Sequence, residues 1–543
     1  MKSPQKMPHN NSQIPLEPSY DSIQGQAAVE RPGEYPFTRG IYAELYRKHP
    51  WMSRQYSGFG LPAETNERAH FLARLGQQHL GNLSVVNAIG DIPSQLGLDS
   101  DDARCRYDVG KCGVALDTID DMIEILKGFD IAKTSVILPF CGNGHGVTAL
   151  LLAAAAEQGV PENQVIGAAQ NNAFDNSLTI KHHYFKHHGH MRLCLDLIDY
   201  TSRKVPKFSP IVFGESTHRE MGAPADKSAA YAIATGVAYT EALAGRGLPV
   251  DVFASKFSFY MNTGNDFFEE IAKYRATRRV WARLMRERCG AQDEASWKAR
   301  ITVRTTGLDL TPQEPLNNII RNTMQALASV LGGVQSLTVT PFDEPVAIPT
   351  EDAQQLAMRV HEILAHETNI RYVTDPLGGS YFMESLTNAM EQRILEGIRE
   401  IEDLLPEDKC RPGMRMFDAL THGIEAGILG RWLDGWGIER QAAIERGDKK
   451  VVGVNYNVKE TWTPAPVWRV DPRVREVKSE MLRKFRAARD QAATQRALER
   501  VREACHTEEN LIPVLRDAFR ARATMGEASQ VMAEVFGEFV PHE

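Results

Sequence analysis

Long hydrophobic runs are missing from this sequence of 543 residues. A membrane-spanning helix needs about 20 consecutive apolar residues. The nearest candidate, Val147 to Ala156, is short and is followed by Glu157-Gln158-Gly159, so we expect a buried helix there. The first residues, 1–34, are polar and rich in proline and lack the apolar core of a signal peptide. These absences predict a cytoplasmic protein with no membrane segment.

The sequence also lacks an excess of basic residues and any closely spaced pair of cysteines. Its formal net charge is -8, whereas domains that bind nucleic acid usually carry a basic excess. Its 7 cysteines form no C-x-x-C pair, so they predict neither a disulfide framework nor a thiolate metal site. Composition therefore favours a reduced protein with no nucleic-acid partner.

Complete phosphate-binding and metal-binding motifs are absent as well. Residues 141–146 read Cys-Gly-Asn-Gly-His-Gly, but they lack the G-x-G-x-x-G and Walker spacings, so we expect a tight strand-to-helix turn. Five histidines have no acidic residue between them and are interpreted as surface residues, with no metal expected. They are His182, His183, His187, His188 and His190. The arginines at 275, 278 and 279 are interpreted as a solvated helix face.

What the sequence does contain is a regular alternation of apolar strands and helical stretches. The expected strands are 83–86, 135–138, 165–169, 211–213, 257–260, 300–305, 336–339 and 370–373. Eight strands with helical crossovers predict an α/β fold of the (β/α)8 TIM barrel type. An open doubly wound sheet is the alternative. We expect a flexible tail over 1–33, the barrel over 34–400 and a helical C-terminal extension over 401–543.

Polar residues follow the expected strands, where the active site of such a barrel lies. They are Asn87, Asn143, Gln170-Asn171-Asn172, Thr217-His218-Arg219, Asn262, Thr306, Thr340 and Asp343-Glu344. Amides and hydroxyls suit a neutral, hydrogen-bonded ligand. Paired carboxylates with metal-ligand spacing and a lysine placed for Schiff-base chemistry are both missing, which gives hydrolysis and aldol chemistry little support.

The segment 37–60 has the composition of a binding site, because aromatic and basic residues alternate there with glycines. It belongs to a set of motifs that occur in one order along the chain. They are 37–40 (FTRG), 54–59 (RQYSGF), 64–68 (ETNER), 99–101 (DSD), 109–115 (VGKCGVA), 265–273 (NDFFEEIAK), 335–337 (QSL) and 375–381 (DPLGGSY). Together they resemble the large, substrate-binding subunit of the adenosylcobalamin-dependent acyl-CoA mutases, the group that acts on methylmalonyl-CoA, isobutyryl-CoA or 2-hydroxyisobutyryl-CoA.

The resemblance implies a barrel whose axis holds the pantetheine arm of CoA, with cobalamin across its top. Residues implied to contact the CoA are Tyr42, Leu45, Arg54, Ser84, Lys256 and Ser258. Tyr56 would lie beside the acyl group, and Gln170 would hydrogen-bond the thioester region. The segment 37–60 would then form a wall of the CoA channel. Asn87, Gly307 and Glu344 match positions that face the cofactor.

The cofactor implied by the resemblance is adenosylcobalamin, which carries the radical chemistry. In this family the lower cobalt ligand is a histidine in an Asp-x-His-x-x-Gly motif, and no such motif occurs in the sequence. We therefore expect a small cobalamin-binding subunit as partner, in a hetero-oligomer, with an acyl-CoA as substrate.

Two departures from the family bear on the substrate. Ile180 stands where methylmalonyl-CoA mutases hold the substrate carboxylate with an arginine, and Thr217 stands at a family histidine, with His218 one residue away. The first hypothesis is a mutase for an acyl-CoA other than methylmalonyl-CoA. The second is a methylmalonyl-CoA mutase that uses Lys181 or Arg219 instead. The third is an inactive scaffold that binds CoA or a partner. The residues 86–93 form an insertion beside the acyl pocket.

Overall fold

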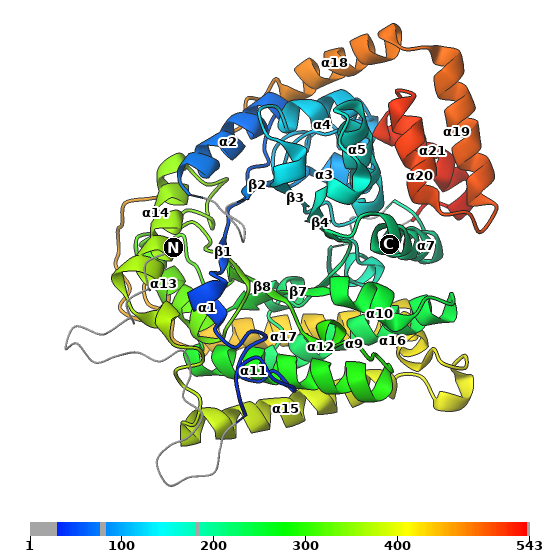
Figure 1. The fold of residues 1–543 in the computed structure, drawn as a ribbon. Coiled ribbons are helices and arrows are strands. Elements are labelled where there is room, and N and C mark those ends of the chain that lie inside the picture. The colour runs from blue at the N-terminus through cyan, green and yellow to red at the C-terminus, as the bar shows by residue number, and fades with distance from the viewer. Residues whose placement is uncertain (1–29, 77–82, 181–183, 540–543) are drawn as a thin grey trace, which may run out of the picture. The chain divides into compact units, whose positions relative to one another are not determined.

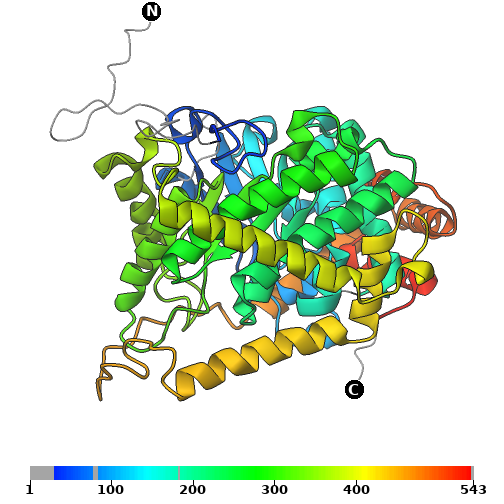
Figure 2. The same cartoon turned by 90° about the horizontal axis from the view of Figure 1, so that it is seen from below.

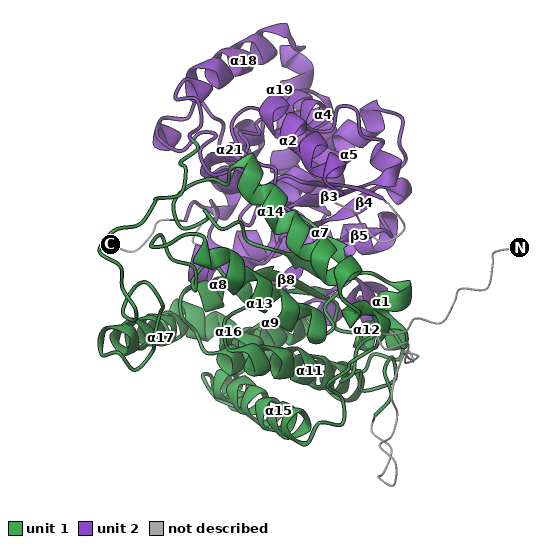
Figure 3. Ribbon diagram, turned by 90° about the vertical axis from the view of Figure 1, so that its left-hand side faces the viewer, with its two compact units in different colours: residues 1–54, 214–241, 258–468 green, residues 55–213, 242–257, 469–543 purple. Residues whose placement is uncertain are grey.

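The computed structural model describes residues 30–76, 83–180 and 184–539. The chain divides into two compact units (Figure 3). Unit 1 comprises Met1–Arg54, Gly214–Glu241 and Ser258–Trp468, and unit 2 comprises Gln55–Phe213, Ala242–Phe257 and Arg469–Glu543. Within the described ranges, no helix has the length and apolar character needed to cross a membrane. The domain boundaries and the location expected from the sequence stay predictions.

Unit 2 contains a parallel sheet of four strands in the order β2-β3-β4-β5 (Figure 1). Their bounds are Ser84–Asn87, Thr134–Leu138, Ile166–Ala169 and Phe208–Ser209. Its helices include α2 (Pro62–Arg74), α3 (Ile92–Leu96), α4 (Ile119–Ile125), α5 (Gly144–Glu157), α6 (Ala173–Asp175), α7 (His187–Lys204), α10 (Val250–Phe253), α18 (Val474–Ala488), α19 (Gln491–Cys505), α20 (Leu511–Arg520) and α21 (Met525–Phe536). The apolar core joins α4 and α5 to the C-terminal helices, since Leu151, Leu515 and Phe519 belong to one buried cluster.

Unit 1 contains a second parallel sheet, in the order β1-β9-β8-β7-β6. The strands are β1 (Met52–Ser53), β6 (Val212–Gly214), β7 (Ser258–Thr263), β8 (Ile301–Thr305) and β9 (Ser336–Thr338). Its helices are α1 (Leu45–Lys48), α8 (Ser216–Glu220), α9 (Ala225–Gly245), α11 (Phe267–Arg283), α12 (Glu294–Trp297), α13 (Asn317–Leu331), α14 (Glu351–Glu362), α15 (Tyr381–Glu402), α16 (Arg415–Glu425) and α17 (Ile428–Glu445). The long helix α15 runs along α11 (Figures 1 and 2).

Two parallel sheets with helical crossovers confirm the α/β class expected from the sequence. Closure of one (β/α)8 barrel stays a prediction. Helix α4 begins at a capping box: the backbone N–H of Asp121 donates to the Thr118 hydroxyl at 3.3 Å, and that of Thr118 donates to the Asp121 carboxylate at 2.9 Å. Residues 141–146 do form a strand-to-helix turn, between the end of β3 and the start of α5.

The strand expected at 370–373 is wrong. Ile370–Tyr372 is one turn of 3-10 helix, and the place beside β9 belongs to β1. The backbone N–H groups of Met52 and Arg54 donate to the carbonyls of Gln335 and Leu337 at 2.9 and 3.2 Å. Periodicity missed β1 because two residues are too few to show alternation. It missed β5 for the same reason.

The expected solvated arginine face on α11 is also wrong, because Arg275, Arg278 and Arg279 are all buried. The Arg278 guanidinium donates to the carbonyls of Phe37 and Thr38 at 3.0 and 2.9 Å. Arg275 is paired with Asp375 and Glu384, and Arg279 with Glu391. Phe37 itself is 0% exposed, so residues 37–40 are packed into unit 1 rather than offered to a ligand.

Candidate functional site

The segment that carries Tyr56 is tied to the carboxyl end of β2 in unit 2. Asn87, the last residue of β2, donates its side-chain amide to the Gln55 carbonyl at 3.1 Å. The backbone N–H and the hydroxyl of Ser57 both donate to the Asn87 carbonyl, at 3.0 and 3.2 Å. Tyr56, which is half-buried, therefore lies between two residues that are fixed to this strand end.

The insertion at 86–93 lies directly against the same segment. A Cβ atom at Gly58 would be 2.0 Å from the carbonyl oxygen of Ile89, so only glycine fits there. Asp91 holds the insertion from the other side, since its carboxylate accepts from the N–H groups of Ser94 and Gly110 at 2.9 and 2.7 Å. Burial raises the pKa of Asp91 to about 7. The segment 86–93 is thus held by hydrogen bonds next to the residues that flank Tyr56.

Gln170 follows β4 and is half-buried. Its backbone N–H donates to the Leu138 carbonyl at 3.2 Å, which extends the pairing of β3 and β4 by one residue. The Cys141 thiol donates to the Gln170 side-chain Oε1 at 2.8 Å. The sequence gives no sign of this contact, although both residues follow neighbouring strands.

Ile180 ends the short π-helix Asn176–Ile180 and is half-buried. Lys181, the first alternative partner for a substrate carboxylate, lies outside the described residues. Farther along, the Arg192 guanidinium donates to the backbone carbonyls of Cys505, Ala504 and Glu509 at 2.9, 3.2 and 3.0 Å. Arg192 is therefore committed to the C-terminal helices.

One of the five histidines expected at the surface is buried. His190 is fully buried, whereas His188 is exposed and His187 half-buried, and His182 and His183 lie outside the described residues. His145, in the first turn of α5, is also fully buried, and neither of its ring nitrogens has a hydrogen-bond partner among the residues the structure describes. Burial lowers the pKa of His145 to about 3, so its ring is neutral at physiological pH.

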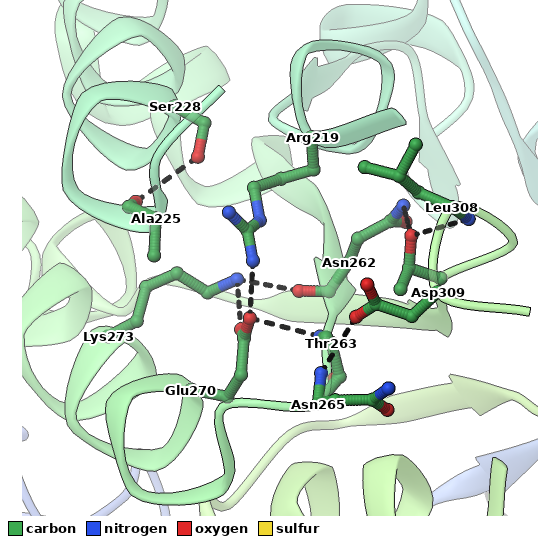
Figure 4. A network of polar contacts seen from close by, with 12 residues as sticks. Arg219, Ala225, Ser228, Asn262, Thr263, Asn265, Glu270, Lys273, Leu308 and Asp309 are labelled. Carbon is green, nitrogen blue, oxygen red and sulfur yellow. Dashed lines mark hydrogen bonds and ion pairs between the residues drawn. The ribbon is translucent and has the colours of Figure 1, made fainter. Parts of the chain in front are cut away.

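At the corresponding end of the unit 1 sheet, charged side chains neutralise one another (Figure 4). The Lys273 ammonium lies 3.0 Å from a Glu215 oxygen and 2.6 Å from a Glu270 oxygen, and all three side chains are fully buried. Arg219 lies 2.7 Å from Glu270 and 3.6 Å from Glu215. Burial alone would raise the pKa of Glu270, but Lys273 and Arg219 outweigh it and hold that pKa below its usual value.

Thr217, His218 and Arg219 lie on the short helix α8, and they face different surroundings. The His218 ring is 2% exposed, is paired through Nδ1 with the Gly214 carbonyl at 3.0 Å, and packs 4.1 Å from the Tyr231 ring centroid. Burial lowers its pKa to about 4. Arg219 also donates to the Ala223 carbonyl at 2.7 Å, whereas Thr217 stays half-buried.

Sequence reasoning missed Glu220, three residues after Thr217. One of its carboxylate oxygens accepts from the Asn262 amide at 2.6 Å and from the Thr306 hydroxyl and the Gly307 N–H at 3.0 Å each. It therefore fixes the loop that carries Gly307. The only signal in the sequence is its place just past an expected strand end.

Glu344 is paired with Arg304 on β8, which also donates to the Thr340 hydroxyl at 3.2 Å. Arg54 is buried, donates to Thr338 at 3.2 Å, and lies 6.0 Å over the Tyr260 ring. Its guanidinium is thus held at the carboxyl end of β9.

The remaining residues expected along the CoA lie elsewhere on the two units. Ser84 and Ser258 open β2 and β7 at their amino ends. The Lys256 ammonium donates to the Pro206 carbonyl. In unit 1, the Tyr42 ring lies 4.5 Å from that of His49, and Leu45 is buried. The structure gives these positions, and their roles toward CoA stay predictions.

The family model for methylmalonyl-CoA mutase matches residues 9–538. The chain belongs to the methylmalonyl-CoA mutase family. It is 36% identical over 528 residues to a probable mitochondrial methylmalonyl-CoA mutase of Caenorhabditis elegans, a match that covers 96% of this chain and 68% of that one. Similar relatives are the mitochondrial methylmalonyl-CoA mutase of Bos taurus, 35% identical over 98% of this chain and 68% of its own, and the methylmalonyl-CoA mutase of Cereibacter sphaeroides, 35% identical over 99% and 74%.

Members of this family are isomerases that use adenosylcobalamin, and the chain is accordingly an acyl-CoA mutase. The strand ends carry groups that suit such a cofactor. The Oδ1 atom of Asn87 is buried and accepts no hydrogen bond from any described residue, so it can receive an amide N–H from the corrin periphery. A Cβ atom at Gly307 would lie 3.6 Å from a Glu220 oxygen, which is ordinary van der Waals contact.

Proposed function

We propose that this chain is the large subunit of an adenosylcobalamin-dependent mutase that rearranges the carbon skeleton of an acyl-CoA other than methylmalonyl-CoA. The cofactor would be held with a separate small cobalamin-binding subunit in a hetero-oligomer. The observation that carries the proposal is Ile180, an apolar residue where a carboxylate-binding arginine is expected.

The charges of the described residues support a neutral acyl group. A substrate carboxylate taken out of water without a cation costs several kcal/mol. Arg219, the second alternative partner, is already bound to Glu215 and Glu270, and Arg192 to three backbone carbonyls. Around Gln170, the side chains are the Cys141 thiol, the Asn176 amide and the Asp175 carboxylate, which raises the pKa of Cys141 and would repel a substrate carboxylate.

Adenosylcobalamin, when bound, supplies the radical chemistry. The chain's own residues bind and orient the thioester. Gln170 would donate its side-chain amide to the thioester carbonyl, and the Tyr56 ring would pack beside the acyl group and exclude water from it. Arg54, Lys256 and the serines that open β2 and β7 would contact the rest of the CoA.

A second candidate is methylmalonyl-CoA itself, which the names of the relatives favour. Tyr56 is common to both candidates. An inactive scaffold, supported by Thr217 at the family's histidine position, is the third.

A panel of CoA thioesters, assayed with adenosylcobalamin and a cobalamin-binding subunit, separates these candidates. We expect conversion of a neutral, branched or hydroxylated acyl-CoA in preference to methylmalonyl-CoA. Preferential conversion of methylmalonyl-CoA to succinyl-CoA would contradict the proposal. Absence of a cob(II)alamin signal across the whole panel, with a partner that is active with a known mutase, would favour the scaffold.

A further inference from the structure

The two ends of the Gln170 side chain have different surroundings within unit 2. Its Oε1 accepts from the Cys141 thiol at 2.8 Å. Its Nε2 has no hydrogen-bond partner among the residues that the structure describes, and the side chain is half-buried. An amide can turn over and exchange its oxygen and nitrogen, so the partner on one side decides what it offers on the other.

The backbone fixes the thiol next to this amide. A Cβ atom at Gly144 would lie 2.4 Å from the Gln170 carbonyl oxygen, so glycine lets the turn after β3 approach the end of β4. The Asn176 amide donates to the Cys141 carbonyl and holds the turn from its other side. Gln170 is anchored in turn by its N–H bond to Leu138. These backbone contacts therefore hold the Cys141 thiol next to the Gln170 amide.

We propose that Cys141 is a positioning residue that fixes the Gln170 amide with its N–H groups toward the ligand. A thiol in this place donates to the amide oxygen, and the free Nε2 then presents donors only. The ligand atom it receives is an acceptor, and in a CoA thioester that atom is the carbonyl oxygen. This inference rests on the proposed function, since it takes the ligand to be an acyl-CoA.

The assignment requires a protonated thiol over the working pH range. Burial, with a contribution from Asp175, raises the pKa of Cys141 to about 12, so the S–H donor persists at neutral pH. A serine hydroxyl can replace it, because its shorter bond to carbon lengthens the contact by only a few tenths of an ångström and so leaves it within hydrogen-bonding range. Alanine cannot.

The test is calorimetric binding of two probes to the full chain: isobutyryl-CoA, and its thioether analogue in which a methylene replaces the carbonyl. We expect the wild type to prefer the thioester. Cys141→Ala should lose about three- to tenfold of that preference with unchanged affinity for the thioether, Cys141→Ser should retain the preference, and Gln170→Ala should abolish it. Cys105→Ala, which removes a different buried thiol, is the matched control and should bind like the wild type.

Infrared spectra of the bound probe with a 13C-labelled thioester carbonyl provide a second readout that loss of stability does not change. The carbonyl band should lie at lower frequency on the wild type and Cys141→Ser than on Cys141→Ala. A full thioester preference and an unshifted band in Cys141→Ala would overturn the inference and leave the proposed function standing. Failure of the wild type to bind either probe would overturn both.

Discussion

The carboxyl ends of the two sheets differ in the charged side chains that they hold. In unit 1, Glu215, Glu270, Lys273 and Arg219 are packed together and neutralise one another. In unit 2, Gln170 lies next to a thiol and amides, and the nearby Asp175 carboxylate raises the pKa of the Cys141 thiol. Buried charges are tolerated where each has a fixed partner. A substrate carboxylate near Gln170 would be repelled by Asp175, so we expect a neutral acyl group there.

The largest effect should come from removing one of the buried cations in unit 1. Lys273→Met leaves the buried carboxylates of Glu215 and Glu270 with one cation, Arg219, in place of two, and we expect a loss of about 3–5 kcal/mol in the free energy of unfolding. Urea denaturation measures it. Lys48→Met, which removes an exposed cation paired with Glu44, should cost less than about 1 kcal/mol. Equal losses of unfolding free energy in the two variants would show that the buried carboxylates of unit 1 do not depend on Lys273.

In unit 2, removal of the ring at Tyr56 should affect turnover far more than folding. Tyr56→Ala is expected to lower kcat by about 100-fold, because the acyl group loses its packing partner. The unfolding midpoint should change little, since the side chain is only half-buried. Tyr107→Ala, at a ring that is 68% exposed, is the control for both measurements. A Tyr56→Ala enzyme with wild-type rates would remove Tyr56 from the site.

Placing a cation at position 180 should change the substrate preference. Ile180→Arg is expected to raise kcat/KM for methylmalonyl-CoA, relative to isobutyryl-CoA, by about ten- to hundredfold, the range for a hydrogen bond to a charged group. The steady-state ratio of the two substrates measures this. Ile180→Leu keeps the volume without the charge and should leave the ratio unchanged. An unchanged ratio in the arginine variant would place Ile180 away from the acyl group.

Acidification tests, without any substrate, whether the His145 ring is held neutral by burial. The pKa of His145 is about 3 in the folded chain and 6.5 in the unfolded chain, so the unfolded state takes up a proton first as pH falls. Stability therefore decreases from pH 6.5 down to about 3. Between pH 7 and 5, His145→Leu should lose about 2 kcal/mol less than the wild type in urea denaturation.

The exposed His188 supplies the control for that comparison. His188→Leu should keep the wild-type difference between pH 7 and pH 5, because its ring is already in solvent. A His145→Leu variant with the same loss as the wild type would mean that this imidazole is not held neutral by the fold.

Apolar alternation was enough to predict most of the strands and the α/β class. It failed at 370–373, where an apolar run forms a 3-10 turn, and at Met52–Ser53, where backbone pairing with β9 decides the structure. The arginines of α11 show a different limit. Nothing in their spacing reveals that Asp375, Glu391 and the carbonyls of residues 37–38 surround them.

Some residues of the candidate site could be placed from the sequence and others could not. Asn87 and Gln170 could be placed at strand ends from the sequence, because each follows an expected strand, whereas Gly307 came from the resemblance to the family. Glu220 and Cys141 could not, since their importance depends on which donors and acceptors the fold brings to them. The burial of His218 against Tyr231 likewise follows from the packing of α9.

The most direct test of a neutral acyl substrate is a competition between isobutyryl-CoA and methylmalonyl-CoA at equal concentration, with adenosylcobalamin and the cobalamin-binding subunit present. The ratio of the two products, measured by chromatography at low conversion, gives the ratio of the two kcat/KM values. We predict that the product of isobutyryl-CoA is formed in excess. An excess of succinyl-CoA would contradict the account.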